Sequence, residues 1–161
     1  GTIRYYGMAT WDCFRVPKEH PQHLLLADVL RLAKEAGGND HGFKFVQLPY
    51  NMYLDQALVL KNQTINGTEA TILEAATNFG IGVFASVPLM QTKLLGPNVI
   101  PEFGGLKSSH RALQFVRSTP GIIAPLVGHK TSSHVDENLE LTKIPPFSDS
   151  EFSQLLKTLT S

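Results

Sequence analysis

Short apolar runs alternate with longer amphipathic segments along the chain. The runs are rich in β-branched and aromatic residues and stop at glycine or proline, which is typical of strands. They occupy Ile3–Met8, Phe43–Leu48, Ile81–Val87 and Ile122–Val127. The runs begin roughly 40 residues apart, a spacing that leaves room for a helical crossover between parallel strands.

Helical periodicity fills the segments between and after these runs. Glycine follows the first two helical patterns, at Gly37-Gly38 and Gly80, as it commonly does past a helix end. Asn66-Gly67 is expected in a loop, and Ser148 with Glu151 forms a capping box. The pattern predicts helices at Gln22–Ala36, Thr68–Phe79, Ser109–Ser118, Ser132–Leu141 and Ser148–Thr158.

This order predicts an α/β fold of parallel βα units, the pattern of a TIM (βα)8 barrel. Runs without clean polar alternation imply strands that are covered on both faces. A complete barrel takes about 250 residues, so residues 1–161 are expected to form one domain containing half of it. Such a half-sheet leaves two apolar edges open.

Composition narrows the class of protein. Fourteen basic residues balance fourteen acidic ones, so no net field favours nucleic acid or anionic lipid as a partner. No apolar run approaches the roughly 20 residues of a membrane helix, and a single cysteine fits a reducing, cytoplasmic setting. The start at Gly1 leads directly into a strand pattern, and we expect it to be a cut end.

Functional groups of such barrels lie where strands run into the following loops. The fourth of these loops combines Gly128 and Lys130 with Thr131 at a helix start. Backbone N–H groups and the helix dipole would favour a phosphate there. Serine or threonine at a helix start more often serves simply as an N-cap, and both interpretations stay open at this point.

The four strand regions also resemble one known family. Ile3–Trp11, Phe45–Asn51, Gly80–Leu89 and Pro120–Asn138 are similar, in order, to the fifth, sixth, seventh and eighth strand regions of the aldo-keto reductases. The resemblance implies the C-terminal half of their barrel and NADP(H)-dependent reduction of aldehydes or ketones. Met90 and Thr92 occupy positions where that family has glycine.

The resemblance implies a cofactor site in three parts. Thr10 and Gln47 would bind the nicotinamide carboxamide, and Ser86 replaces an aromatic ring that stacks on the nicotinamide. Pro88 and Leu89 would line the pyrophosphate. Lys130 would bind the 2′-phosphate, and Glu137 and Asn138 would hold the adenine. The full set of residues for the adenosine end follows the fourth strand: Gly128, Lys130, Thr131, His134, Glu137 and Asn138.

The sequence offers no catalytic residue of its own. The family's catalytic Asp, Tyr, Lys and His come from the first four strands, and a carbonyl reduction needs a proton donor. The pair His20 and His23 lacks further ligands for a metal site, and Cys13 is expected to be an inert, half-buried thiol.

Three hypotheses remain open at this stage. The first is an NADPH-binding half that needs a missing N-terminal half-barrel. The others are a non-catalytic module that binds cofactor or a protein partner, and a half-barrel covered by a second copy of itself.

Overall fold

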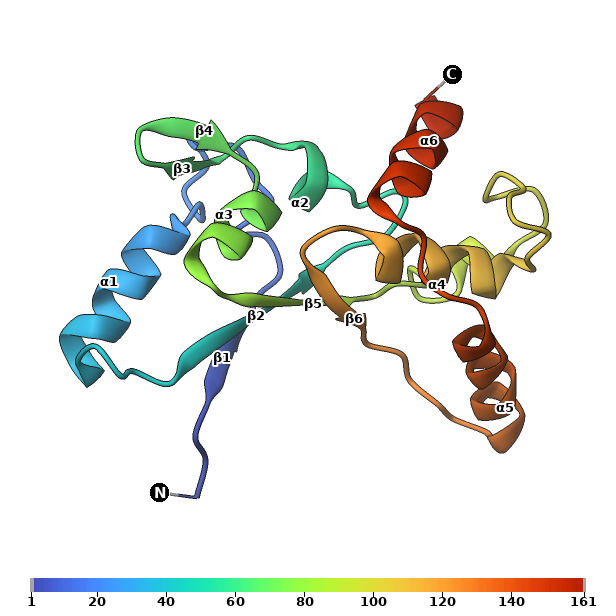
Figure 1. Cartoon of the computed structure of the whole chain (residues 1–161), viewed down its shortest axis with the longest axis horizontal. Coiled ribbons are helices and arrows are strands. Elements are labelled where there is room, and N and C mark those ends of the chain that lie inside the picture. The colour runs from blue at the N-terminus through green and yellow to red at the C-terminus, as the bar shows by residue number, and fades with distance from the viewer. Residues whose placement is uncertain (1, 161) are drawn as a thin grey trace.

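A four-stranded parallel sheet forms the centre of the fold (Figure 1). The computed structural model describes residues 2–160. The strands β1 (Tyr6–Ala9), β2 (Phe43–Pro49), β5 (Gly82–Ser86) and β6 (Ile122–Pro125) stand in that order, and every neighbouring pair is parallel. The parallel α/β architecture predicted from the sequence is therefore confirmed.

Helices connect and follow these strands. In Figure 1, α1 (Leu26–Gly37), α3 (Ile72–Phe79) and α4 (Ser108–Ser118) succeed one another from left to right in the order of the strands. No helix within residues 2–160 is long and apolar enough to cross a membrane. The remaining helical elements are α2 (Gln56–Val59), η1 (Lys93–Leu95), α5 (Ser132–Glu140), η2 (Leu141–Lys143) and α6 (Asp149–Thr160).

The core lies between the helices and one face of the sheet. Side chains alternate between the two faces along a strand, and on this face they pack with residues of α1, α3, α4 and α6. The residues of the two central strands on this face are fully buried: Val46, Leu48, Val83 and Ala85.

The opposite face is open, contrary to the expectation of strands covered on both faces. Phe45 and Phe84 are only half-buried, and the side chains of Tyr5 and Ile123 are each 52% exposed. The four strands advance in chain order across the sheet, so right-handed crossovers bring every connecting helix to the same side. We call the face that carries Phe45, Gln47, Phe84 and Ile123 the open face.

Two glycines shape the open face. A Cβ atom at Gly7 would collide with the carbonyl oxygen of Phe45, and one at Gly82 would collide with the side chain of Ile123. The two phenylalanine rings of this face are neighbours, with centroids 5.6 Å apart. Small and large residues therefore alternate across the open face, as they do where layers of side chains fill a barrel interior.

A short hairpin replaces the predicted first turn of α3. Strands β3 (Gln63–Ile65) and β4 (Thr68–Ala70) are antiparallel and joined by Asn66-Gly67, both with positive φ, as a two-residue hairpin turn requires. The predicted helix start at Thr68 is therefore wrong. The helix begins at Ile72 because Thr71 and Glu74 form a capping box.

The first helix also begins later than its periodicity suggested. It starts at Leu26 instead of Gln22, and its N-cap residue Leu25 provides no side-chain hydrogen bond. The side-chain amide of Gln63 caps the helix instead. It accepts from the backbone N–H of Leu26 at 2.8 Å and donates to the carbonyl of Leu24 at 3.0 Å. The hairpin thus fixes the start of α1 from a distant part of the chain. Strand β1 likewise begins at Tyr6 and not at Ile3.

Candidate functional site

The predicted site residues meet at one edge of the sheet. Because all four strands are parallel, their carboxyl ends lie along the same edge. Thr10 follows β1, Gln47 belongs to β2, Pro88 follows β5 and Lys130 follows β6. The order across the edge is therefore the order in which the sequence assigned nicotinamide, pyrophosphate and adenosine phosphate.

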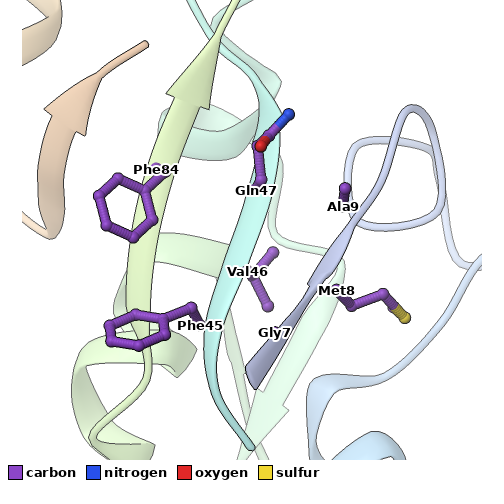
Figure 2. A pocket seen from close by; sticks show the side chains of 7 residues that line it. All are labelled: Gly7, Met8, Ala9, Phe45, Val46, Gln47 and Phe84. Atoms are coloured by element: carbon purple, nitrogen blue, oxygen red, sulfur yellow. The ribbon is translucent and has the colours of Figure 1, made fainter. Parts of the chain in front are cut away.

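Gln47 lies on the open face near the end of β2. Figure 2 shows its amide above the rings of Phe45 and Phe84, in a cavity of about 200 Å³ that Ala9 also lines. Among the described residues, the amide of Gln47 has no hydrogen-bond partner, although its residue is half-buried. An amide in that setting is free to both donate to and accept from a ligand.

Thr10 is tied to the backbone of the neighbouring strand. Its N–H and its hydroxyl both donate to the carbonyl oxygen of Gln47, at 2.8 Å and 2.9 Å. The hydroxyl hydrogen is therefore used within the protein, and only the oxygen lone pairs remain for a ligand. Thr10 could accept from an amide N–H, but it has no hydrogen to donate.

Two adjoining cavities lie between the loop after β5 and the segment that follows β6. The first measures about 270 Å³ and contacts Val87 and Pro88, and the second measures about 210 Å³ and reaches α5. The two cavities share part of their walls, so they form a continuous hollow along the carboxyl ends of the strands. The shared residues are Leu89, Thr92, Val127 and Gly128.

The loop after β5 has an unusual backbone. Val87, Met90, Gln91 and Thr92 all have positive φ, between 48° and 70°, a region that non-glycine residues and especially β-branched ones rarely adopt. Met90 and Thr92, at positions where the resemblance implies glycine, thus have a backbone conformation that glycine adopts without strain. Strain of this kind persists where the surrounding structure fixes it, and it concentrates at functional sites.

Glu137 forms part of the wall of the second cavity. Its carboxylate accepts from the Ser109 hydroxyl at 2.6 Å and lies 3.2 Å from the Lys107 ammonium group. The hydrogen bond from Ser109 and then that from Lys107 lower the pKa of Glu137 below its usual value. The carboxylate therefore stays ionised and accepts hydrogen bonds at neutral pH. Sequence reasoning missed Lys107 and Ser109 because they lie at the start of a different helix, without a local signal.

The start of α5 places the other adenosine-end residues. His134 and Asn138 line the same cavity as Glu137, and Thr131 caps the helix by accepting from the N–H of His134 at 3.4 Å. Lys130 is exposed and makes no ion pair with another described residue. The cavities do not include Ser86, Lys130 or Thr131.

The remaining candidate groups serve the fold. No three metal-ligating side chains come together among residues 2–160, and His23 instead bonds the carbonyl of Asn62 at 2.7 Å. Tyr50 is buried with its hydroxyl 3.0 Å from that of Thr119, and burial raises its pKa. Cys13 is half-buried as predicted.

The fold has a counterpart among solved structures. It is similar to the aldo-keto reductase AKR11C1 from Bacillus halodurans in its holo form, with a TM-score of 0.61 and 16% sequence identity over 98% of this chain and 50% of that one. No model of a known protein family and no curated protein matches the sequence. The chain spans about half the length of that reductase and has the fold of half its barrel, as the four motifs predicted.

Proposed function

We propose that this chain is the NADP(H)-binding half of an aldo-keto reductase, an oxidoreductase that reduces aldehydes or ketones. The order of the site residues across the sheet supports this proposal. Residues assigned to the nicotinamide stand at β1 and β2, those for the pyrophosphate after β5, and those for the adenosine phosphate after β6. One extended dinucleotide could contact all three groups along a single edge.

The nicotinamide would lie against the open face. The unpartnered amide of Gln47 can pair with the carboxamide, and Thr10 can accept from the same group, so together they would select the ring face that is presented. When bound, the cofactor supplies the hydride for carbonyl reduction. Gln47 and Thr10 would hold and orient the ring, while the substrate would approach from the side of the open face.

The other end of the dinucleotide would occupy the two adjoining cavities. Pro88 and Leu89, on their walls, would contact the pyrophosphate. Lys130 would meet the 2′-phosphate beside Thr131, at the N-terminus of α5, where backbone N–H groups favour an anion. Four residues on the wall of the second cavity would surround the adenine: Gly128, His134, Glu137 and Asn138. Glu137 can accept a hydrogen bond from the adenine amino group, and Asn138 can both donate and accept.

Reduction would need a partner that supplies a proton donor. Among the described residues, strands β1 and β6 each have only one neighbour in the sheet, and the alternating small and large side chains of the open face suit a barrel interior. A second set of four βα units would pair with the outer strands β1 and β6, cover Phe45 and Phe84, and bring acid–base groups beside Gln47. The proposed partner is therefore an N-terminal half-barrel.

Two alternatives share the same cofactor site. A second copy of this chain could cover the open face, because β6 of one copy could pair with β1 of the other on both sides of a closed ring. The lack of an assigned proton donor, together with Ser86 in place of a stacking aromatic ring, instead favours a non-catalytic module that binds the cofactor or a protein partner. The reductase half and a cofactor-binding module both require NADPH to bind at this edge, whereas a module that binds only a protein partner does not.

The test is a fluorescence titration of the purified chain with NADPH, followed by assay of an aldehyde with and without a separately expressed N-terminal reductase half. We expect NADPH binding that weakens in Gln47→Leu and Lys130→Ala, and turnover only with both halves present. Binding without turnover even when the N-terminal half is added would support the non-catalytic module, and a dimer in light scattering would support the second copy. Absence of NADPH binding with and without the added half would overturn the proposal.

A further inference from the structure

Asn51 lies fully buried where β2 ends, beside the loop that follows β5. Its side-chain oxygen accepts from the backbone N–H groups of Tyr53 and Leu54, both at 2.9 Å. Its side-chain nitrogen donates to the carbonyl oxygen of Val87 at 3.0 Å. This side chain therefore joins the loops that follow two neighbouring strands.

The carbonyl that Asn51 binds belongs to a residue in a disfavoured conformation. Val87 has φ of 48°, which a β-branched residue adopts only when its surroundings compensate. The same carbonyl also accepts from the N–H of Met90 at 2.9 Å. Two donors thus fix the direction of this peptide group at the point where the loop leaves the sheet.

This loop forms one wall of the cavity of about 270 Å³ that contains Pro88 and Leu89. We infer that Asn51 is a positioning residue, which holds Val87 in its left-handed conformation and so presents the loop to the phosphate groups of a dinucleotide. The identity of this ligand as a dinucleotide rests on the proposed function. Asn51 would not touch the ligand, because it acts through the backbone of Val87.

A second buried asparagine provides a matched comparison. Asn62 is 1% exposed, and its side-chain nitrogen donates to the carbonyls of Phe14 and Val16 at 2.9 Å and 2.8 Å. It therefore makes hydrogen bonds of the same kind, but neither Phe14 nor Val16 lines a cavity of the nucleotide site, whereas Val87 does. Loss of Asn62 should destabilise the fold without changing the loop after β5.

The experiment compares Asn51→Ser with Asn62→Ser. A serine at position 51 keeps an oxygen that can accept from Tyr53 and Leu54 but is too short to reach Val87. We expect NADPH affinity to fall roughly 10-fold in Asn51→Ser, the scale of one lost hydrogen bond, and to stay within about twofold of the original in Asn62→Ser. Both NADPH affinities are measured at a temperature well below the melting temperatures of the variants.

A second change tests whether the effect passes through Val87. Glycine adopts positive φ without strain, so Val87→Gly should recover most of the affinity lost in Asn51→Ser. Hydrogen exchange of the Met90 amide gives a readout without ligand, and it should accelerate in Asn51→Ser and not in Asn62→Ser. If Asn51→Ser does not fold, Asn51→Asp serves instead, because it keeps the accepting oxygen but cannot donate when ionised.

The outcomes separate this inference from the proposed function. Unchanged NADPH affinity and unchanged Met90 exchange in Asn51→Ser would overturn the positioning role while leaving the nucleotide site intact. Equal losses of affinity in the Asn51 and Asn62 variants, without rescue by Val87→Gly, would reduce Asn51 to a general stabilising residue. Absence of NADPH binding by the unaltered chain, both alone and with the added N-terminal half, would overturn the proposed function, and with it the role of Asn51 toward a ligand.

Discussion

The two faces of the sheet differ although they come from the same strands. Along β2, Val46 and Leu48 are fully buried beneath the helices, whereas Phe45 and Gln47, which alternate with them, are half-buried on the open face. Alternate residues of one strand therefore have different tasks. The covered face stabilises this chain, and the open face carries the groups proposed for a cofactor and a partner half-barrel.

The largest contrast is expected between Leu48→Ala and Phe84→Ala. Leu48→Ala leaves a cavity in the core and should lower the free energy of unfolding by about 3 kcal/mol. Phe84→Ala removes a larger side chain from the open face, yet it should cost only about 1 kcal/mol, because that ring is only partly buried and borders an open cavity, so its loss leaves no enclosed void. Urea denaturation measures both, and equal losses would show that the open face is packed in solution.

Glycine packing on the open face gives the next effect. In Gly7→Ala the new methyl group meets the backbone carbonyl of Phe45, so β1 and β2 must move apart, at a cost of about 2 kcal/mol. Gly128→Ala is the control, because no atom lies within 4 Å of its added Cβ, and it should change stability by less than about 0.5 kcal/mol. A similar melting temperature for both variants would contradict this arrangement of β1.

A somewhat smaller effect is expected on the covered side, at the start of α1. Gln63→Leu leaves the N–H of Leu26 without its partner and should cost about 1–2 kcal/mol, with faster hydrogen exchange at Leu26. Gln22→Leu changes an exposed residue and should leave both the stability and that exchange unchanged. Slow exchange at Leu26 in Gln63→Leu would mean that the hairpin does not cap this helix.

The smallest effect concerns Cys13, at the margin between the covered and open regions. Burial raises the pKa of its thiol, so alkylation should reach half its maximal rate above the ordinary cysteine pKa of about 8.5. Because the folded state disfavours the thiolate, stability should fall as the pH rises from that ordinary value toward the raised one. An inflection at or below the value measured in urea would contradict the half-buried position.

Much of the fold was predictable because its signals are local. Apolar runs located all four parallel strands, and the spacing between them indicated helical crossovers. The hairpin was missed because Thr68–Ala70 was joined to the following helix, although Asn66-Gly67 and the Thr71–Glu74 capping box marked its boundaries. The capping of α1 by Gln63 has no local signal, since it links positions 37 residues apart.

The candidate site was predictable in outline and less so in detail. Parallel strands necessarily bring Gln47 and Lys130 to one edge of the sheet. The hydrogen bonds that hold Glu137 depend on the packing of α4 against α5, and the connection from Asn51 to Val87 depends on neighbouring strands. Contacts of this kind arise from tertiary structure, so the motifs alone did not contain them.

The most direct test of the account is an NMR titration of the labelled chain with NADPH, followed at backbone amides. A dinucleotide along the proposed edge predicts shifts at Gln47, at Leu89 and in α5, with Gly42 and Gly121 at the opposite ends of the strands unchanged. Shifts confined to the amino ends of the strands, or no shift at saturating NADPH, would contradict a nucleotide site at this edge.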